Sequence, residues 1–278
     1  MSIKIVVDSI SDMPSGLIEK YGINVMPLIV RFGEDEYKDG VDLTADNFYE
    51  RVAGGEWPAT SVPAVGEFAE LYKRLSSQAD GIISIHVSSK LSGTYNSAVQ
   101  GAASIESGCP IKVVDSQQAS MGIGMLALVA AKAVENGDDL ETIYDKVNNA
   151  IPKVQCFALL DTLEYLQRGG RLGKGAALLG GLLNFKPILR LSDGEVHPFA
   201  RPRSRRKGIN KLVETAMEFG NLEEAAVMYS TDPEETSGII ESLSDLTTDD
   251  AKPILVRMGP GLGTHAGPGA LGIALLTK

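Results

Sequence analysis

Residues 81–98 read GIISIHVSSKLSGTYNSA, an apolar run followed directly by a polar stretch that leads into a helical pattern. The apolar run, 81–87, has the length and composition of a buried strand. The hydroxyls, the glycine and the free backbone N–H groups that follow it are the components of an anion site at a helix N-terminus. The stretch therefore predicts a strand-to-helix unit that binds an anion, with the alternative that Ser92 or Thr94 only caps its own helix.

Strand and helix signals alternate through the first half of the chain, which is typical of a mostly parallel sheet flanked by helices. Val6-Val7-Asp8-Ser9 and Val113-Val114-Asp115-Ser116 both place Asp-Ser at the carboxyl end of a strand, the edge where open α/β sheets bind ligands. The pattern predicts strands at 3–7, 23–32, 81–87 and 111–114, turns at 33–36 and 60–63, and helices at 14–21, 45–54, 65–75, 94–105 and 117–135, with a shorter helix after Asp139.

The pattern changes near Pro152, which predicts an N-terminal α/β lobe at 1–152 and a C-terminal α+β lobe at 153–278. In the second half, Ser192-Asp193-Gly194 lies between two extended runs, a hairpin signal that indicates a mixed or antiparallel sheet. The fold class is thus α/β with two lobes. We also expect a basic glycine-rich loop at 168–175, an apolar helix after it through Phe185, and a glycine-rich loop at 259–269 before the last strand.

The composition narrows the class of protein. The chain has 278 residues, 44% of them hydrophobic, and a formal charge of −10. Its first residues lack the pattern of a signal peptide, and its apolar runs fall short of the roughly 20 residues of a membrane span. We therefore expect a soluble, cytoplasmic protein without a transmembrane segment. Cys109, Cys156 and the three histidines show no metal-binding spacing, so no metal site is predicted.

Positive charge is concentrated at 168–211, where eleven Lys or Arg residues accompany two acidic residues. Such a tract binds an anionic ligand, docks an acidic protein partner or forms a solvated face. RNA binding is disfavoured because stacking aromatic residues are missing. We therefore expect no nucleic-acid partner, and keep a nucleic-acid-binding protein only as the third hypothesis.

Thr60-Ser61, Ser92-Gly93-Thr94 and His265 carry the chemistry of a binding site, together with the basic loop. Hydroxyls at a helix N-terminus donate to a carboxylate or phosphate, and a histidine among glycines places a titratable donor where backbone can approach a ligand closely. The Gly-Lys-Ser/Thr ending of a phosphate-binding loop and the Gly-x-Ser-x-Gly of a hydrolase are both missing. A serine-type hydrolase or acyltransferase that uses Ser92 and His265, with a carboxylate such as Asp8, stays open as the second hypothesis.

Six motifs occur in order along the whole chain: Val6-Val7-Asp8-Ser9, Thr60-Ser61-Val62-Pro63, Ser89-Lys90-Leu91-Ser92-Gly93-Thr94-Tyr95, Val114-Asp115-Ser116, Arg168-Gly169-Gly170-Arg171 and His265-Ala266-Gly267-Pro268-Gly269. Together they resemble the DegV family. One departure is visible at 60–64, where Val62 and Ala64 replace polar members of the family turn.

The resemblance implies the two-lobed EDD fold with a long-chain fatty acid between the lobes, and no cofactor. It implies a lipid-binding subunit without turnover of its own, which presents the fatty acid to a separate ATP-dependent fatty acid kinase that forms the acyl phosphate. Transient contact with a membrane surface is compatible with that role. For the tail, we expect walls from 180–185, Ile188 and Phe199, with the alternative that these residues form ordinary core.

Carried over to matching positions, the resemblance assigns two groups of residues. Thr60, Ser61, Ser92 and His265 would bind the carboxylate, with Gly93 and Thr94 shaping its pocket. Arg168, Arg171, Arg201 and Arg203 would face the kinase or the transferred phosphate.

Overall fold

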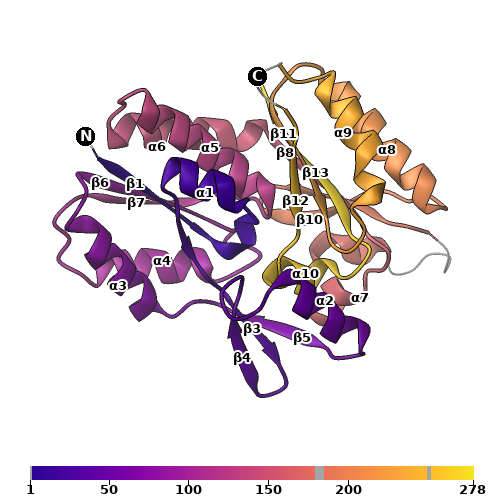
Figure 1. Cartoon of the computed structure of the whole chain (residues 1–278), viewed down its shortest axis with the longest axis horizontal. Helices are drawn as coiled ribbons and strands as arrows, with labels where there is room; N and C mark the ends of the chain where they lie inside the picture. The colour runs from indigo at the N-terminus through magenta and orange to yellow at the C-terminus, as the bar shows by residue number, and fades with distance from the viewer. Residues whose placement is uncertain (1, 179–184, 249–251) are drawn as a thin grey trace.

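Four parallel strands form the sheet of the first half of the chain (Figure 1). The computed structural model describes residues 2–178, 185–248 and 252–278. The strand order is β2-β1-β6-β7, and every neighbouring pair is parallel. The predicted parallel sheet is therefore confirmed. Its strands are β1 (Ile3–Asp8), β2 (Asn24–Met26), β6 (Gly81–His86) and β7 (Ile111–Asp115).

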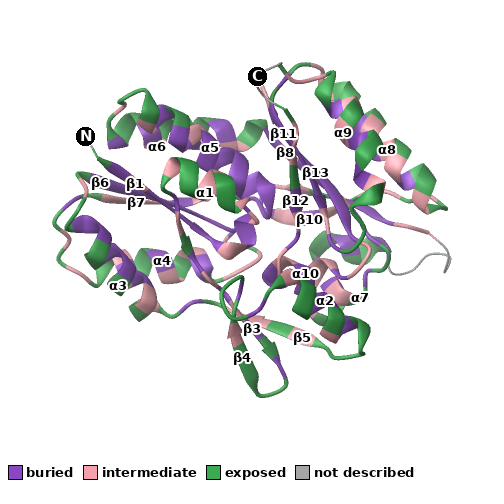
Figure 2. Cartoon of the chain, viewed as in Figure 1, coloured by how far each residue is buried: buried purple, intermediate pink, exposed green. Residues whose placement is uncertain are grey.

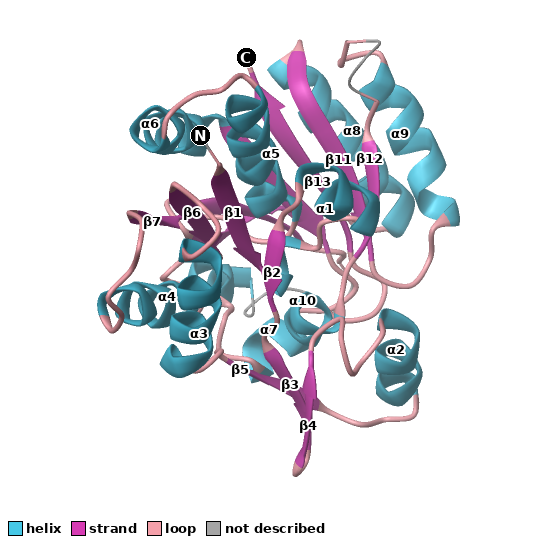
Figure 3. Cartoon of the chain, turned by 60° about the vertical axis from the view of Figure 1, so that its left-hand side comes forward, coloured by secondary structure: helices cyan, strands magenta, loops and turns pink. Residues whose placement is uncertain are grey.

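Helices cover both faces of this sheet (Figure 3). On one face, Phe68 and Tyr72 pack against Val6 and Ile82. On the other face, the next residues along the strands, such as Ile5 and Ile83, pack with the long apolar helix α5. The side chains alternate between the faces because successive strand residues point in opposite directions. The helices are α1 (Ser15–Tyr21), α3 (Val65–Ser76), α4 (Thr94–Ala103), α5 (Met121–Glu135) and α6 (Leu140–Ala150), with the short η1 (Ser9–Ser11) after β1.

Helix α5 begins at Met121, so the predicted start at Gln117 is wrong. Gln117 and Ser120 have φ angles of +54° and +51°. These left-handed conformations cannot continue into a right-handed helix. The loop 116–120 is therefore held in a sparsely populated geometry at the carboxyl edge of the sheet.

A small antiparallel sheet lies below the parallel one in the view of Figure 1, in the order β4-β3-β5. The sequence predicted turns at 33–36 and 60–63, but the turn is limited to Gly33-Glu34, and Thr60 and Ser61 belong to a strand. The strands at 35–38 and 58–61 were missed because their composition is polar. Each lies at an edge of the sheet, where one face stays exposed to solvent. The elements are β3 (Ile29–Phe32), β4 (Asp35–Lys38), β5 (Pro58–Ser61) and α2 (Ala45–Ala53), whose cap is the Thr44 hydroxyl.

The second half contains a six-stranded mixed sheet in the order β10-β9-β8-β13-β11-β12. Only β11 and β12 run parallel, so the predicted mixed sheet is confirmed. The β9–β10 hairpin is also confirmed: Asp193 and Gly194 both have positive φ angles, as a type I′ turn requires. The strands are β8 (Val154–Leu159), β9 (Ile188–Ser192), β10 (Glu195–Ala200), β11 (Leu222–Tyr229), β12 (Ile254–Arg257) and β13 (Leu271–Thr277).

Helices α8 and α9 pack on one face of the six-stranded sheet, around Phe157, Leu212 and Ile239. The apolar helix expected before Phe185 is only partly described, because 179–184 lie outside the described residues. The helices of this half are α7 (Glu164–Arg168), α8 (Arg205–Phe219), α9 (Ser237–Ser244) and α10 (Pro260–Ala266), with the short η2 (Ile151–Lys153), η3 (Gly173–Leu178) and η4 (Glu234–Thr236).

The segment predicted as a glycine-rich loop at 259–269 contains the helix α10, which corrects that prediction. Its glycines serve close packing. A Cβ on Gly263 would lie 2.6 Å from the Tyr49 hydroxyl and 2.7 Å from Phe48 Cε1. A Cβ on Gly261 would collide with the Asp39 carboxylate. The glycines therefore let α10 lie directly against residues of the first half.

The largest hydrophobic cluster includes residues from both halves, with α5 between the two large sheets (Figure 2). Ile5 and Ile85 of the parallel sheet and Ala274 of the mixed sheet belong to this one cluster. The division into lobes at 152 remains a prediction. Across the described ranges 2–178, 185–248 and 252–278, no helix is long and apolar enough to cross a membrane.

Candidate functional site

A cavity lies between the carboxyl edge of the parallel sheet and the face of the mixed sheet that points away from α8 and α9. Its walls are mainly aliphatic and come from segments that are distant in sequence. The parallel-sheet side contributes Ile10, Leu28, Val87, Leu91 and Ala119; the mixed-sheet side contributes Cys156, Phe157, Ala158, Leu160, Leu189, Arg190, Leu191, Val196 and Met228; and Leu166 of α7, Leu262 and Ala266 of α10, and Met258 just before α10 close it.

Polar groups gather where β5, α10 and the loop after β6 meet. Thr60 Oγ1 lies 2.9 Å from His265 Nε2, and both residues line the cavity with Ser92 and Arg171. The Arg171 guanidinium donates to the carbonyl oxygens of Leu91, at 3.1 Å, and of Gly169, at 2.5 Å. The structure thus brings two hydroxyls, an imidazole and a guanidinium to one end of a mainly apolar cavity.

The environment of His265 keeps its imidazole neutral. Desolvation, followed by the positive charge of Arg171, lowers the pKa of His265 to about 4. Its Nδ1 is buried without a hydrogen-bond partner among the described residues, and it lies so close to Gly169 that a side chain there would collide with it. An N–H left unpaired in such a place is costly. The proton therefore belongs on Nε2, which donates to Thr60 Oγ1 and leaves the Thr60 hydroxyl hydrogen for a ligand.

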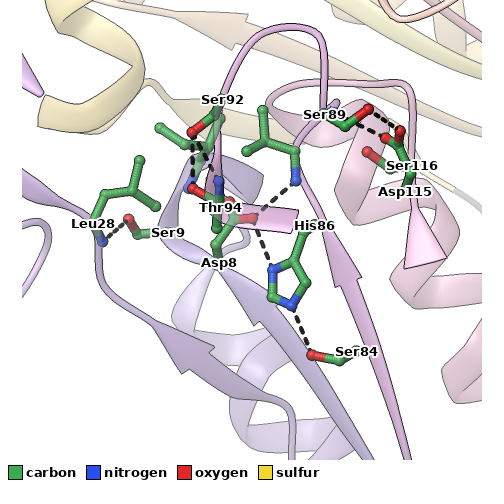
Figure 4. A network of polar contacts seen from close by, with 12 residues as sticks. Asp8, Ser9, Leu28, Ser84, His86, Ser89, Ser92, Thr94, Asp115 and Ser116 are labelled. Carbon is green, nitrogen blue, oxygen red and sulfur yellow. Dashed lines mark hydrogen bonds and ion pairs between the residues drawn. The ribbon is translucent and has the colours of Figure 1, made fainter. Parts of the chain in front are cut away.

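Ser92 is held by the start of α4. Its Oγ accepts from the Thr94 backbone N–H, at 3.3 Å, and lies 2.9 Å from Thr94 Oγ1 (Figure 4). Thr94 is fully buried and Gly93 is exposed at the helix start. Ser61 follows Thr60 in β5, so the two side chains point to opposite sides of the strand. Of the six expected carboxylate residues, Thr60, Ser92 and His265 line the cavity, whereas Ser61, Gly93 and Thr94 are not among its described lining residues.

The predicted arginines separate into two pairs. Arg168 stacks on Trp57, with its guanidinium 3.6 Å from the ring centroid, and lines a second pocket that shares Thr60, Arg171 and His265 with the cavity. Arg201 instead donates to the Ala177 carbonyl at 3.0 Å, and Arg203 is exposed after β10. The structure therefore brings Arg168 and Arg171 to the polar end of the cavity, and places Arg201 and Arg203 outside both pockets.

The walls expected for a ligand tail are mostly elsewhere. Ile188 and Phe199 pack on the α8 side of the mixed sheet, and 180–184 lie outside the described residues. Phe185 contacts the main cluster but is not among the described lining residues. The actual wall includes Cys156, Ala158 and Leu160, a period-two set that a strand presents on one face. Residues 154–160 are apolar on both faces apart from Gln155, so the sequence carried no signal that distinguished the ligand wall from ordinary core.

The Asp8 carboxylate, at the end of β1, holds the backbone at the end of β6 in place. Asp8 accepts from Val87 N at 2.9 Å and from His86 Nδ1 at 3.0 Å, while His86 Nε2 lies 2.7 Å from Ser84 Oγ (Figure 4). All three side chains are fully buried. Asp8 is therefore bonded to His86 and not to His265, so the triad of Ser92, His265 and Asp8 is not formed.

Two contacts hold the loop after β6. The Asp115 carboxylate accepts from the Ser89 N–H, at 3.1 Å, and from the Ser89 hydroxyl, at 2.5 Å. The Ser88 hydroxyl donates to the Gly194 carbonyl, at 2.7 Å, in the hairpin of the other half. These contacts fix the path on which Ser92 lies. Within the part of the chain that the structure describes, no group of three or more His, Cys, Asp or Glu side chains is placed to hold a metal ion.

Comparison with known proteins identifies the family. A model of the DegV family, described as uncharacterised proteins, matches residues 2–278. The chain belongs to the DegV family. The resemblance predicted from six motifs is thereby confirmed. A DegV domain-containing protein of Caldanaerobacter subterraneus is 38% identical over 275 residues, which cover 98% of this chain and 97% of that protein.

Solved structures of other proteins share the fold. A DegV family protein from Thermus thermophilus, described for its fatty acid binding, superposes with a TM-score of 0.93 at 32% identity and full coverage of both chains. A stearic acid-binding protein from Eubacterium ventriosum gives a TM-score of 0.90 at 28% identity, covering 99% of this chain and 98% of that one. The predicted fold class is confirmed by these likenesses.

Proposed function

We propose that this protein binds a long-chain fatty acid, with the acyl chain in the apolar cavity and the carboxylate at Thr60, Ser92 and His265. The observation that carries the proposal is the coincidence of a largely aliphatic cavity with one polar end built from two hydroxyls. The fatty-acid-binding relatives support the same ligand class.

The physical chemistry of the ligand matches the two parts of the site. Each methylene buried in the aliphatic walls contributes about 0.8 kcal/mol, so a long chain supplies a large driving force. The carboxylate, by contrast, costs several kcal/mol if it is buried without hydrogen-bond donors. The Thr60 and Ser92 hydroxyls supply donors, and the nearby Arg171 guanidinium supplies positive charge while already bonded to two carbonyls.

The protein would act as a carrier that presents the carboxylate to a separate ATP-dependent kinase for acyl phosphate formation. The second pocket supports this step, because it reaches the polar end from outside and is rimmed by Arg168 and Trp57. Arg168 is about half exposed and pairs with Glu164 at 2.7 Å, so an anionic partner group would compete with Glu164 for its guanidinium. Arg201 and Arg203 lie outside both pockets and would contribute only to the docking of the kinase surface.

Organic extraction of the purified protein followed by mass spectrometry tests the ligand class. We expect one co-purifying fatty acid per chain. The variants Ser92→Ala and Thr60→Val should each lower fatty-acid affinity at least about tenfold, because each removes a donor to a charged group. Ser97→Ala, one turn further along α4 and outside the described lining, is the matched control and should retain the ligand. Unchanged affinity in both site variants would refute the proposed clamp.

A serine-type hydrolase or acyltransferase is the second candidate, because Ser92 and His265 line the same cavity. Its prediction is covalent labelling of Ser92 by a fluorophosphonate probe. The same probe must label a known serine hydrolase in parallel. If it then does not label Ser92, and the fatty acid is recovered intact, the hydrolase is excluded and only the carrier function remains.

A further inference from the structure

One hydroxyl lies in the cavity wall apart from the polar end. Ser120, in the loop before α5, lines the cavity and is only 3% exposed. Its backbone has a φ of +51° and a ψ of −141°, a conformation that residues other than glycine rarely adopt. Such strained residues persist only where the surroundings hold them, and they gather at binding sites.

Asp12 holds this serine. Ser120 Oγ lies 2.6 Å from Asp12 Oδ2, and Asp12 Oδ1 accepts from the Gly259 N–H at 2.8 Å. Desolvation raises the pKa of Asp12 to about 8, so the carboxyl group is mainly protonated at neutral pH. The Ser120 hydroxyl donates to this carboxyl group, so both acceptor positions of Ser120 Oγ stay open to a ligand hydroxyl. A hydroxyl has one donor and two acceptor positions, so Ser120 keeps hydrogen-bonding capacity beyond Asp12.

Helix α10 gives the distance between Ser120 and the polar end. Leu262, His265 and Ala266 line the cavity at helical spacing, so one face of α10 runs along it, and Met258 lines it just before the helix begins. Asp12 is bonded to Gly259, just before the first residue of α10, whereas His265 lies in its last turn. Six residues of helix span about 9 Å. Ser120 therefore stands beside the middle of a bound acyl chain and not beside its carboxylate.

We propose that Ser120 is a specificity-determining residue that accepts a long-chain fatty acid with a mid-chain hydroxyl group. This inference rests on the proposed fatty-acid binding and specifies which class of fatty acid the cavity accepts. A hydroxyl on the chain would otherwise lose its water partners in an aliphatic cavity, and Ser120 replaces them. The neighbouring Cys156, Met228 and Met258 side chains are at most weak hydrogen-bonding groups. In this part of the described wall, the group that can replace water is therefore the Ser120 hydroxyl.

The test compares two ligands in delipidated full-length protein: octadecanoic acid and 10-hydroxyoctadecanoic acid, measured by calorimetry. We expect wild type to bind the hydroxy acid at least as tightly as the unsubstituted acid. Ser120→Ala should lower affinity for the hydroxy acid about tenfold and change affinity for octadecanoic acid less than about twofold. Ser92→Ala is the contrast, because it should weaken both ligands by the same factor through their common carboxylate.

Equal effects of Ser120→Ala on the two acids, or rejection of the hydroxy acid by wild type, would overturn the inference while leaving fatty-acid binding intact. Failure of both acids to bind would refute the proposed function itself and this inference with it. If Ser120→Ala does not fold, Ser120→Gly replaces it, because glycine adopts the positive φ of this position without strain.

Discussion

His265 illustrates how burial sets the chemistry of a single side chain. Its pKa is about 4, against an ordinary value near 6.5. Between these two pH values the His265 imidazole therefore stays neutral in the folded chain but is protonated in the unfolded chain. The unfolded chain takes up the proton first as the pH falls. The stability that depends on neutral His265 is therefore complete above pH 6.5 and declines as the pH falls towards 4.

We expect the His265 imidazole resonances of the ligand-free protein to show no titration above about pH 5 in NMR spectra. Desolvation is the larger cause and Arg171 the smaller, so Arg171→Gln should raise the His265 pKa only in part. The His265→Gln spectrum assigns the resonances. A midpoint near 6.5 would contradict the buried, neutral state of this ring.

Asp12 gives the opposite pH dependence. Its pKa is about 8 in the folded chain and near 3.8 when unfolded, so the folded state keeps a proton that the unfolded state releases. This contribution to stability is complete below about pH 4 and is lost as the pH rises through 8. Asparagine mimics the protonated acid and tolerates the Asp12 φ of +50°.

We therefore expect Asp12→Asn to be more stable than wild type at pH 9, by about 1–2 kcal/mol after allowing for partial solvent screening. Urea unfolding at several values between pH 5 and 9 measures the difference. The two stability curves should converge as the pH falls. Parallel curves would show that Asp12 is ionised throughout.

At the scale of elements, α10 depends on glycine for its position. The Gly263 Cα faces Phe48, which is fully buried, and the Tyr49 hydroxyl, which also donates to the Met258 carbonyl at 3.2 Å. These groups belong to α2, so a shift of α2 would also move the helix that carries His265.

Gly263→Ala should destabilise the protein by about 1–3 kcal/mol, because neither ring has room to yield. Gly66→Ala in α3 is the matched control. Its added methyl meets no atom within 4 Å, and it should leave stability unchanged or raise it by up to about 1 kcal/mol. Denaturant unfolding compares the two. Equal stability of both variants would mean that α10 is not held by this contact.

At the scale of the whole molecule, one cluster joins the two halves. Leu126 and Leu128 of α5 are buried with Ile85 of the parallel sheet and Ala274 of the mixed sheet. In addition, Lys132 Nζ lies 2.5 Å from Glu224 Oε1 of β11, an ion pair between the halves. Neither half can separate without exposing the apolar faces of α5.

Calorimetry should therefore show a single unfolding transition, with equal calorimetric and van't Hoff enthalpies. Saturating octadecanoic acid should raise the midpoint, because it binds only the folded chain. Two resolved transitions would indicate that the halves, divided near residue 152, unfold independently.

Much of the fold could be predicted because the signals for helices, strands and turns depend on residues that are close together in the sequence. The buried run 81–87, the Asp139 and Thr44 caps and the Asp193-Gly194 turn are signals between near neighbours. The errors fall where tertiary contacts override composition. β4 and β5 are polar edge strands, α10 is a glycine-rich helix stabilised by packing, and the loop before α5 is held by Asp12 in a left-handed conformation.

The amino-acid sequence by itself determined the family, the parallel and mixed sheets, and Thr60, Ser92 and His265 as candidate ligand-binding residues. Only the tertiary structure decided which of the candidates face one cavity, that Asp8 pairs with His86, and that Ser120 stands in the cavity wall. The physical reason is sequence separation. Helix and strand patterns act over a few residues, whereas the cavity joins β5, the loop after β6, β8 and α10, whose positions depend on packing across the whole chain.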